Sequence, residues 1–455
     1  MSDNSEPDPV QDEQVPVISD ALVMFGLTGD LGRKKLFPAL YELAAQGDLD
    51  IPVIGVGRSE LTDDDLRESF RDAMSGHEPA DGSEVDTAVV ERVRLSYLAG
   101  DSTEPATFDR LLERLDAAVG DVVAPLVYAA LPPNLFGEVA AGMAASDFPS
   151  AARLVVEKPF GDGVETARAL WNEMTEHVPA EQLFIVDHFL AKSAVENMAV
   201  VRHVNPILSN CLDRRQVSLV EIVMSEAGDV DGRGSFYEGV GAVNDVVQSH
   251  LLQTMALLLM DVPAAGDVDD YRRERIALLA AVDPVDPALV TMGQYDGYRD
   301  HDEVADDSNV ETYVSLELHA DTDRWRGVPI RITTGKNLAE TATTATFHLD
   351  GNASSASQSN RIRFEIKPSV ALDIDIAVLD AESHELVGAT LHACGPEDHG
   401  ALGDYATMFA DARNGVQRHF AHIDGVVEAW RILAPLADVD LERHIYQPGS
   451  DGPPS

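Results

Sequence analysis

Residues 21–35 read Ala21-Leu-Val-Met-Phe25-Gly26-Leu-Thr-Gly29-Asp30-Leu-Gly32-Arg33-Lys34-Lys35, an apolar run that passes directly into a glycine-rich turn. Five apolar residues followed by glycine predict a buried strand that ends in a tight turn. Glycines between a strand and a helix let backbone amides approach a phosphate, and the helix N-terminus adds a favourable dipole. Tight turns need glycine anyway, so the meaning of this turn depends on the pattern that follows it.

After the turn, apolar runs alternate with stretches that have helical spacing and acidic first turns. The runs typical of strands are 21–25, 53–56, 93–98, 126–131, 154–156 and 183–186. Helical spacing occurs at 61–74, 108–119, 134–144 and 164–177. Six strands separated by helices predict a Rossmann-like α/β domain over residues 20–200, with a doubly wound parallel sheet. In that setting the glycine turn is a dinucleotide site.

The second half of the chain has a different rhythm. Segments 217–224, 312–320, 329–333, 345–349, 361–366 and 372–378 resemble strands without regular helices between them. They predict a larger α+β domain over 201–455 with a mainly antiparallel sheet. The apolar segment 245–260 predicts one long buried helix. Residues 1–19 lack apolar periodicity and are expected to form a disordered acidic tail.

The charge of the chain limits the classes of function. The 455 residues carry a formal net charge of -46, which would repel a nucleic-acid backbone. No run of about twenty apolar residues is present, so no membrane span is expected. Two cysteines are too few for a disulfide framework and fit a reducing, cytoplasmic compartment. The acidity fits either a high-salt cytoplasm or an ordinary acidic bacterial proteome.

Lysine is rare here, since only six of the 33 Lys and Arg residues are lysine. Five of them, Lys34, Lys35, Lys158, Lys192 and Lys336, lie in short segments that also collect Gly, Asp, His or Pro. Accidental placement would scatter them along the chain. Their grouping indicates an anionic, phosphorylated ligand that needs compact ammonium groups.

The turn after the second strand indicates the cofactor. It reads Gly57-Arg58-Ser59 and lacks the acidic residue that usually binds a free ribose hydroxyl. Arginine with a neighbouring hydroxyl suits the 2'-phosphate of NADP. The alternative is a surface arginine that pairs with Glu60 or with an acidic helix.

Two further strands end in charged motifs. Glu157-Lys158-Pro159-Phe160-Gly161 follows the fifth strand, where Lys158 can reach substrate or cofactor and Pro159 is a candidate cis residue. Asp187-His188-Phe189-Leu190-Ala191-Lys192 follows the sixth strand. The cations at its positions 188 and 192 suit a phosphate dianion, although a solvated helix start is the alternative.

A histidine on the apolar helix is the candidate base. A lone buried histidine such as His250 is more often a satisfied core residue than a base. Asp187 is a plausible partner, which would hold its tautomer and stabilise the imidazolium formed on proton uptake.

Taken together, these segments resemble the glucose-6-phosphate dehydrogenase family. The resemblance runs from about residue 21 to the C-terminus. Its motifs are the glycine turn, Gly57-Arg58-Ser59, Ala130-Leu131-Pro132-Pro133, Glu157–Gly161, Asp187–Lys192, Gly232-Arg233-Gly234, Asp245-Val-Val-Gln-Ser-His250, Gly327-Val328-Pro329, Gly335-Lys336 and Glu428-Ala429-Trp430-Arg431-Ile432.

The resemblance implies oxidation of β-D-glucose 6-phosphate at C1 to 6-phosphoglucono-1,5-lactone, with hydride transfer to NADP, as the first step of the oxidative pentose phosphate pathway. It implies that His250 is the general base and that Asp187 orients it. The implied substrate contacts are His188 and Lys192 at the phosphate and Lys158, Glu226, Asp245 and Lys336 at the sugar. The cofactor contacts expected are Gly26, Thr28, Gly29, Asp30, Leu31, Lys35, Arg58 and Lys158. The antiparallel sheet of the second domain implies a homo-oligomer, a dimer or tetramer.

The chain departs from the family pattern at several positions. Ala191 replaces a usual glycine, Ile185 a common arginine and Phe189 a frequent tyrosine, while Thr341 stands near a usual basic residue. Lys367 is near the family's substrate-contacting glutamine and can compensate. These departures leave open a nucleotide-binding paralogue with weak or altered sugar-phosphate dehydrogenase activity. A two-domain sugar dehydrogenase of the glucose–fructose oxidoreductase type shares the Glu-Lys-Pro turn but lacks the other motifs.

Overall fold

The computed structural model describes residues 17–79, 83–230, 232–261, 263, 268–350, 360–367, 369–394, 402–437 and 439–454. Most of the predicted acidic tail, residues 1–16, lies outside this range. Ser19, the last residue of the predicted tail 1–19, is buried and donates its backbone N–H to the Arg413 carbonyl at 2.9 Å. Within the described range, none of the helices combines the length and the apolar character that crossing a membrane requires.

The N-terminal domain contains a sheet with the strand order β15-β6-β5-β4-β1-β2-β3. These strands are β1 (Leu22–Phe25), β2 (Val53–Gly57), β3 (Leu95–Ala99), β4 (Leu126–Ala129), β5 (Arg153–Val156), β6 (Leu183–Val186) and β15 (Phe420–Ala421). Strands β1 to β6 are parallel to one another, which confirms the predicted doubly wound sheet. The order reverses between β1 and β4, where such sheets open a ligand crevice at the strand C-termini.

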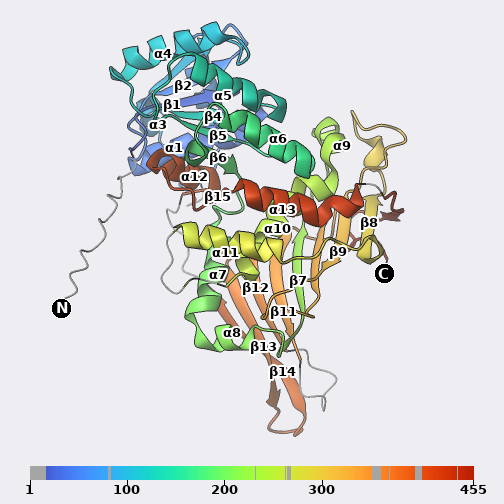
Figure 1. The fold of residues 1–455 in the computed structure, drawn as a ribbon. Coiled ribbons are helices and arrows are strands. Elements are labelled where there is room, and N and C mark those ends of the chain that lie inside the picture. Colours follow the sequence, from blue (N-terminus) through green and yellow to red (C-terminus); the bar gives the residue numbers. More distant parts are fainter. Residues whose placement is uncertain are drawn as a thin grey trace, which may run out of the picture.

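Helices cover both faces of this sheet (Figure 1). They are η1 (Gly32–Leu36), α1 (Phe37–Gln46), α2 (Asp63–Ser75), α3 (Thr87–Arg92), α4 (Pro105–Val119), η2 (Pro133–Leu135), α5 (Phe136–Ala145), α6 (Val164–Thr175) and η3 (Ala180–Gln182). Alternate side chains of the buried strands enter two separate apolar clusters, one on each face.

The second domain is built on a sheet with the order β14-β13-β12-β11-β7-β10-β9-β8-β16. Its strands are β7 (Val217–Ser225), β8 (Val290–Tyr295), β9 (Tyr313–Leu318), β10 (Ile330–Gly335), β11 (Ala342–Leu349), β12 (Asn360–Lys367), β13 (Ala371–Leu379), β14 (Leu386–Cys394) and β16 (Arg443–Tyr446). Most neighbours are antiparallel, as predicted, with β7–β10 and β8–β16 parallel. The sequence interpretation did not include β8, β14 and β16.

The helices of the second half pack on one face of that sheet and against the first domain (Figure 1). They are α7 (Ser193–Val204), α8 (Pro206–Cys211), α9 (Gly234–Ala242), η4 (Val243–Leu251), α10 (Leu252–Leu259), α11 (Val268–Ala280), η5 (Pro287–Leu289), η6 (Tyr298–Asp300), α12 (Asp404–Asn414), α13 (Ile423–Leu433) and η7 (Ala434–Leu436). The predicted helix 245–260 is present, but its first half, η4, is π-helical.

The C-terminal helix α13 joins the two cores. Ile423, Val426 and Trp430 pack in an N-terminal cluster, whereas Ala429 and Ile432 pack in the cluster of the second domain. Just before it, β15 adds an antiparallel strand beside β6. The late segment 402–433 therefore completes the first sheet and packs against both apolar cores. The predicted boundary near residue 200 coincides with the change from the first sheet to the second. It does not predict that the chain comes back to the first domain at residues 402–433.

Candidate functional site

The glycine turn has the shape that a phosphate-binding turn requires. Gly26 follows β1 with φ +75°, and a Cβ there would lie 2.2 Å from the Ala130 carbonyl oxygen at the end of β4. A Cβ on Gly32 would lie 1.7 Å from the Leu27 carbonyl oxygen. Gly29, by contrast, is exposed, so the backbone between β1 and η1 is open to a ligand. These glycines fit a dinucleotide whose phosphates approach the main chain.

The other predicted cofactor residues surround this turn. A Cβ on Gly57, at the end of β2, would lie 3.9 Å from the Thr28 hydroxyl, so the first two turns adjoin. Arg58 and Lys35 are exposed, and Asp30 forms an exposed ion pair with Lys34 at 3.8 Å. This arrangement leaves the Arg58 guanidinium accessible to a ligand.

Lys158 connects the first domain to the π-helix of the second. The Lys158–Pro159 peptide bond is cis, as the sequence indicated. The Lys158 ammonium donates to the Asp245 carbonyl at 2.5 Å and to its carboxylate at 3.0 Å. Burial raises the pKa of Asp245, but the charges of Lys158, Lys336 and His250 outweigh it and lower the pKa overall.

The Asp187–His250 pair is formed as predicted. Asp187 Oδ1 lies 2.6 Å from His250 Nδ1, and both residues are buried. In an α-helix, residues five apart would point about 140° away from each other. The i→i+5 bonding of η4 instead brings Asp245 and His250 closer to one face of the helix.

The electrostatics of this pair favour a neutral imidazole beside an ionised carboxylate. Burial and the nearby Lys158 ammonium lower the pKa of His250 to about 4, despite the opposing influence of Asp187. Burial raises the pKa of Asp187, but His250, His188 and Lys158 together lower it to about 2. Near neutral pH the proton of the ring therefore sits on Nδ1, facing Asp187, and Nε2 can accept a proton.

His188 and Lys192 lie together, as expected, but they share a carboxylate that the sequence did not reveal. Asp404 Oδ2, at the start of α12, lies 2.5 Å from the Lys192 ammonium and 3.7 Å from His188 Nδ1. The centre of the His188 ring is 4.5 Å from the centre of the His250 ring, so these two residues adjoin the Asp187–His250 pair.

Lys336 and Glu226 follow two neighbouring strands and form an ion pair. β7 and β10 are parallel and end together, with Ser225 opposite Gly335. Lys336 also lies 5.3 Å from the centre of the Tyr237 ring. Lys367 is the last residue of β12 and pairs with Thr343 of β11. Because β11 pairs with β7, Lys367 lies at the same end of the sheet as Glu226 and Lys336. The proposed compensation by Lys367 stays a prediction.

Aromatic and acidic residues to which the sequence analysis gave no role in the site hold this cluster. The Phe189 ring stacks on His250 at 4.4 Å, and the Lys192 ammonium lies 5.0 Å from the Phe189 centroid. The buried Glu157 carboxylate accepts hydrogen bonds from Tyr128 and Tyr405, and burial raises its pKa. Position 189 was noted only as a departure from a usual tyrosine.

A buried arginine supports the cluster from α11. Arg275 donates to the Phe420 carbonyl at 2.8 Å. Burial lowers its pKa to about 10, and the opposing influence of Asp187 shows that the two charges interact. Asp187 Oδ2 itself is buried and accepts no hydrogen bond from the described residues.

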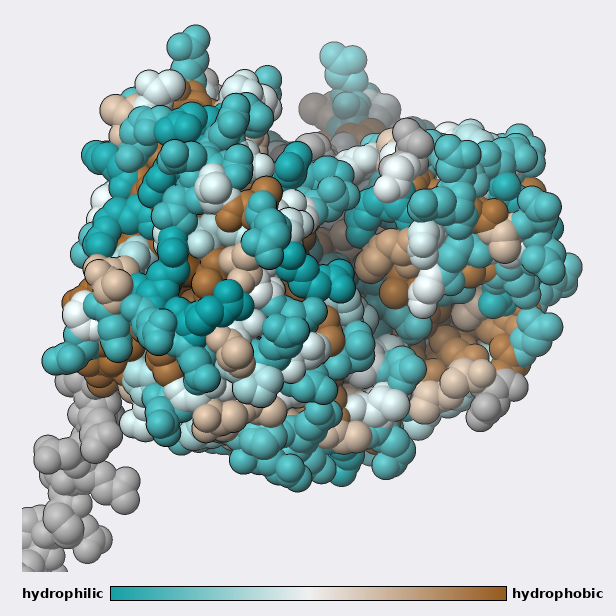
Figure 2. Space-filling view, turned by 90° about the horizontal axis from the view of Figure 1, so that it is seen from above, coloured by the Kyte–Doolittle hydropathy of each residue, from teal (hydrophilic) through white to brown (hydrophobic). Residues whose placement is uncertain are grey.

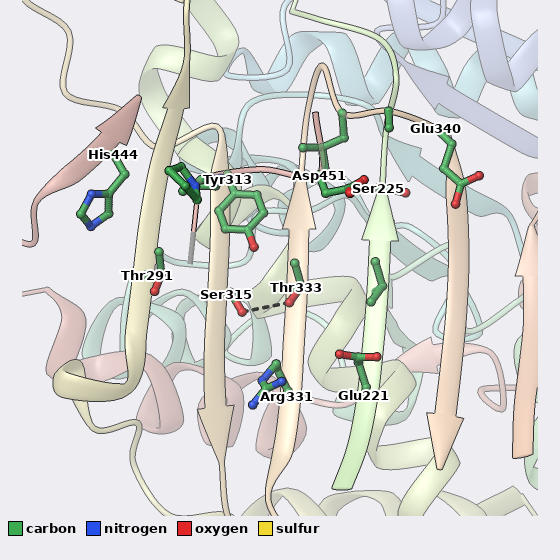
Figure 3. Close-up of a pocket in the computed structure, with 15 residues that line it drawn as sticks. Glu221, Ser225, Thr291, Tyr313, Ser315, Arg331, Thr333, Glu340, His444 and Asp451 are labelled. Atoms are coloured by element: carbon green, nitrogen blue, oxygen red, sulfur yellow. Dashed lines mark hydrogen bonds between the residues drawn. The ribbon is translucent and has the colours of Figure 1, made fainter. Parts of the chain in front are cut away.

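The opposite face of the large sheet is hollowed but carries different residues. The cavity there has a volume of about 690 Å³. Figure 3 shows that Glu221 on β7 and Arg331 on β10 line it, with Ser315 and Thr333 further along β9 and β10. The Ser315 and Thr333 hydroxyls are hydrogen-bonded at 2.9 Å. None of the predicted site residues lines this cavity. It is a separate, mixed-charge surface.

The strand order, the glycine turn and the buried Asp–His pair in a lysine-lined crevice define a two-domain oxidoreductase with a nicotinamide-dinucleotide domain. Residues 23–197 match the family described as "Glucose-6-phosphate dehydrogenase, NAD binding domain", and residues 199–455 match its "C-terminal domain". The chain belongs to the glucose-6-phosphate dehydrogenase family.

Individual relatives agree over nearly the whole chain. Glucose-6-phosphate 1-dehydrogenase 1 of Mycobacterium tuberculosis is 35% identical over 96% of this chain and 93% of its own. The Saccharomyces cerevisiae enzyme is 32% identical over 98% and 90%. A crystal structure of the Mycobacterium avium enzyme superposes with a TM-score of 0.88 at 36% identity, over 96% and 95%. A structure of glucose-6-phosphate dehydrogenase with glucose 6-phosphate gives 0.87 at 28% identity, over 96% of each chain.

Proposed function

We propose that this protein oxidises β-D-glucose 6-phosphate at C1 to 6-phospho-D-glucono-1,5-lactone, with NADP as hydride acceptor, as the first step of the oxidative pentose phosphate pathway. The observation that carries the proposal is the buried Asp187–His250 pair at 2.6 Å, with Lys158, His188 and Lys192 around it. A base and several cations in one crevice suit an anionic sugar whose hydroxyl loses a proton.

Each group has a role in this reaction. Lys192 and His188 bind the phosphate, and Lys158, Asp245 and the Lys336–Glu226 pair hold the sugar hydroxyls. His250 Nε2 accepts the C1 hydroxyl proton, and Asp187 stabilises the imidazolium that forms. The C1–H bond breaks as its electron pair leaves with the hydrogen, and the C1–O bond becomes the lactone carbonyl. The nicotinamide supplies the hydride acceptor when the dinucleotide is bound at the glycine turn.

The direct test is turnover of glucose 6-phosphate with NADP, followed by absorbance of the reduced nicotinamide. We expect rapid turnover by the wild-type protein and near-complete loss in His250→Asn, with substrate binding retained. Binding of the nucleotide without turnover would instead identify a paralogue that has lost efficient chemistry. Full turnover in His250→Asn would overturn the assignment of the base.

The preference for NADP rests on Arg58. Its side chain is exposed beyond β2, and its charge lowers the pKa of the neighbouring Asp101 after the larger effect of the Thr103 hydrogen bonds. Arg58→Ala should lower kcat/KM for NADP much more than for NAD. Arg67→Ala is the matched control, because Arg67 is an exposed arginine of α2 paired with Asp64. A wild-type preference for NAD would contradict the proposal.

We also propose that the protein is cytoplasmic. We further propose that it forms a homodimer through the open face of the large sheet. The hollow there carries both signs of charge, with Glu221, Glu340 and Asp451 beside Arg331. A two-fold axis would bring such a patch onto its own copy with opposite charges facing. The mass in solution should be that of a dimer, and Arg331→Glu should favour the monomer. Sedimentation of the wild-type protein as a monomer would refute this interface.

A further inference from the structure

The phosphate-side cations of the crevice already hold an anion. Asp404 presents one carboxylate oxygen to both residues, at 2.5 Å from Lys192 Nζ and 3.7 Å from His188 Nδ1. Its side chain is 28% exposed, so solvent reaches it. A carboxylate in this position binds the same groups that a substrate phosphate needs.

The start of α12 is held in place on both sides of Asp404. Before it, the Gly403 N–H donates to Glu42 Oε2 at 2.8 Å. After it, the Tyr405 ring stacks on His188 at 5.8 Å, and its hydroxyl hydrogen-bonds to buried Glu157. The backbone on either side of residue 404 is therefore fixed, and only the Asp404 side chain is left to move.

Lys192 and His188 do not depend on Asp404 for their positions. The Lys192 ammonium lies over the Phe189 ring at 5.0 Å. The His188 ring is packed between the rings of His250, at 4.5 Å, and Tyr405. Removing the Asp404 charge should thus leave both side chains in place, which distinguishes a competitor from a residue that only orients its neighbours.

Asp404 is negatively charged in the free protein. Burial raises its pKa, but His188 and Lys192 outweigh this effect and lower the pKa below its ordinary value. An ionised carboxylate and a phosphate dianion repel each other at hydrogen-bond distance from one ammonium.

We propose that Asp404 determines substrate affinity by competing with the sugar phosphate for Lys192 and His188, and that its side chain turns away when the phosphate binds. This inference rests on the proposed function. The charge of Asp404 weakens phosphate binding, and an uncharged side chain at position 404 would remove this effect. We expect the change in KM and not in kcat, because Asp404 contacts His188 and Lys192 and not the proposed base His250.

The test is Asp404→Asn, which keeps the shape and removes the charge. KM for glucose 6-phosphate should fall by about tenfold or more, as expected when a like charge is removed from a binding site, with kcat nearly unchanged. Asp321→Asn is the matched control, because it removes one charge from an exposed pair with Arg326, and it should leave KM unchanged. An unchanged or increased KM in Asp404→Asn would overturn the proposal.

A binding measurement separates this inference from the proposed activity. Calorimetric titration of the NADP-loaded protein with inorganic phosphate should show about tenfold tighter binding in Asp404→Asn than in wild type, by the same removal of repulsion. Lys192→Ala should abolish that binding. If the wild type does not oxidise glucose 6-phosphate, the function fails, but this titration still tests the competition. Equal phosphate affinity in wild type and variant would refute it. Asp404→Ser, which also removes the charge, is the second variant if Asn prevents folding.

Discussion

Asp187→Asn is the substitution that tests the proposed base most sharply. It retains the size of the side chain but removes the charge beside His250, 2.6 Å from Nδ1. With about 4 Å between the centres of the two charges and an effective dielectric constant of about 20, the lost attraction to the imidazolium is about 4 kcal/mol. Each 1.4 kcal/mol is tenfold in rate, so kcat should fall by roughly 10³. KM should change little, because Asp187 faces the imidazole and not the sugar.

The pH profile gives this test a second, independent readout. Asp187 raises the pKa of His250, although burial and Lys158 outweigh it. Removing the carboxylate should therefore move the acid limb of kcat/KM below the wild-type position near pH 4 while the plateau falls. Loosened packing would instead hydrate His250 and move the limb up, towards about 6.5. Asp321→Asn should show neither change. A loss of kcat of less than about tenfold in Asp187→Asn would be well below the usual contribution of general-base catalysis. That result would show that the base has been misassigned.

Three further outcomes are expected. The wild-type kcat/KM should be lost as pH falls through about 4, because His250 must be unprotonated and its pKa is lowered to about 4; loss near 6.5 would show an exposed base. Phe189→Leu should lower kcat by up to about tenfold, since it removes aromatic stacking on His250 worth about 0.5–1.5 kcal/mol, whereas Phe189→Tyr should be tolerated; steady-state kinetics measures both. Gly26→Ala should lower the free energy of unfolding in urea by about 1–3 kcal/mol more than Gly47→Ala does. Both glycines have positive φ, but only at Gly26 does the added Cβ meet a carbonyl oxygen, at 2.2 Å. Equal losses in the two variants would exclude the clash.

The parts of the fold that could be predicted are those with a local signal. Parallel strands buried on both faces read as short apolar runs, so the sequence predicts the six parallel strands of the seven-stranded first sheet. Neither β15 nor the π-helical η4 has such a signal. Two residues are too short to show a period of two, and an apolar run predicts a helix but not its hydrogen-bond spacing.

The same distinction holds for the site. Asp187 and Lys158 end neighbouring parallel strands, β6 and β5, so topology alone places them in one crevice. Pairing Asp187 with His250 needed the additional inference that the buried helix packs there. Asp404 is 212 residues from Lys192 in sequence and reaches it only because α12 and β15 return to the first domain. No periodicity or spacing near residue 404 indicates that return.

Because lysine is rare in this chain, the sequence could reveal the lysine of each ion pair in the site but not its carboxylate partner. Each of the three crevice lysines is held by one carboxylate: Lys158 by Asp245, Lys192 by Asp404 and Lys336 by Glu226. Six lysines in a long chain are conspicuous, whereas the carboxylates that matter are hidden among 79 Asp and Glu residues. If Lys192 exchanges Asp404 for the substrate phosphate, as we propose, the free energy of displacing that carboxylate determines how tightly the phosphate binds.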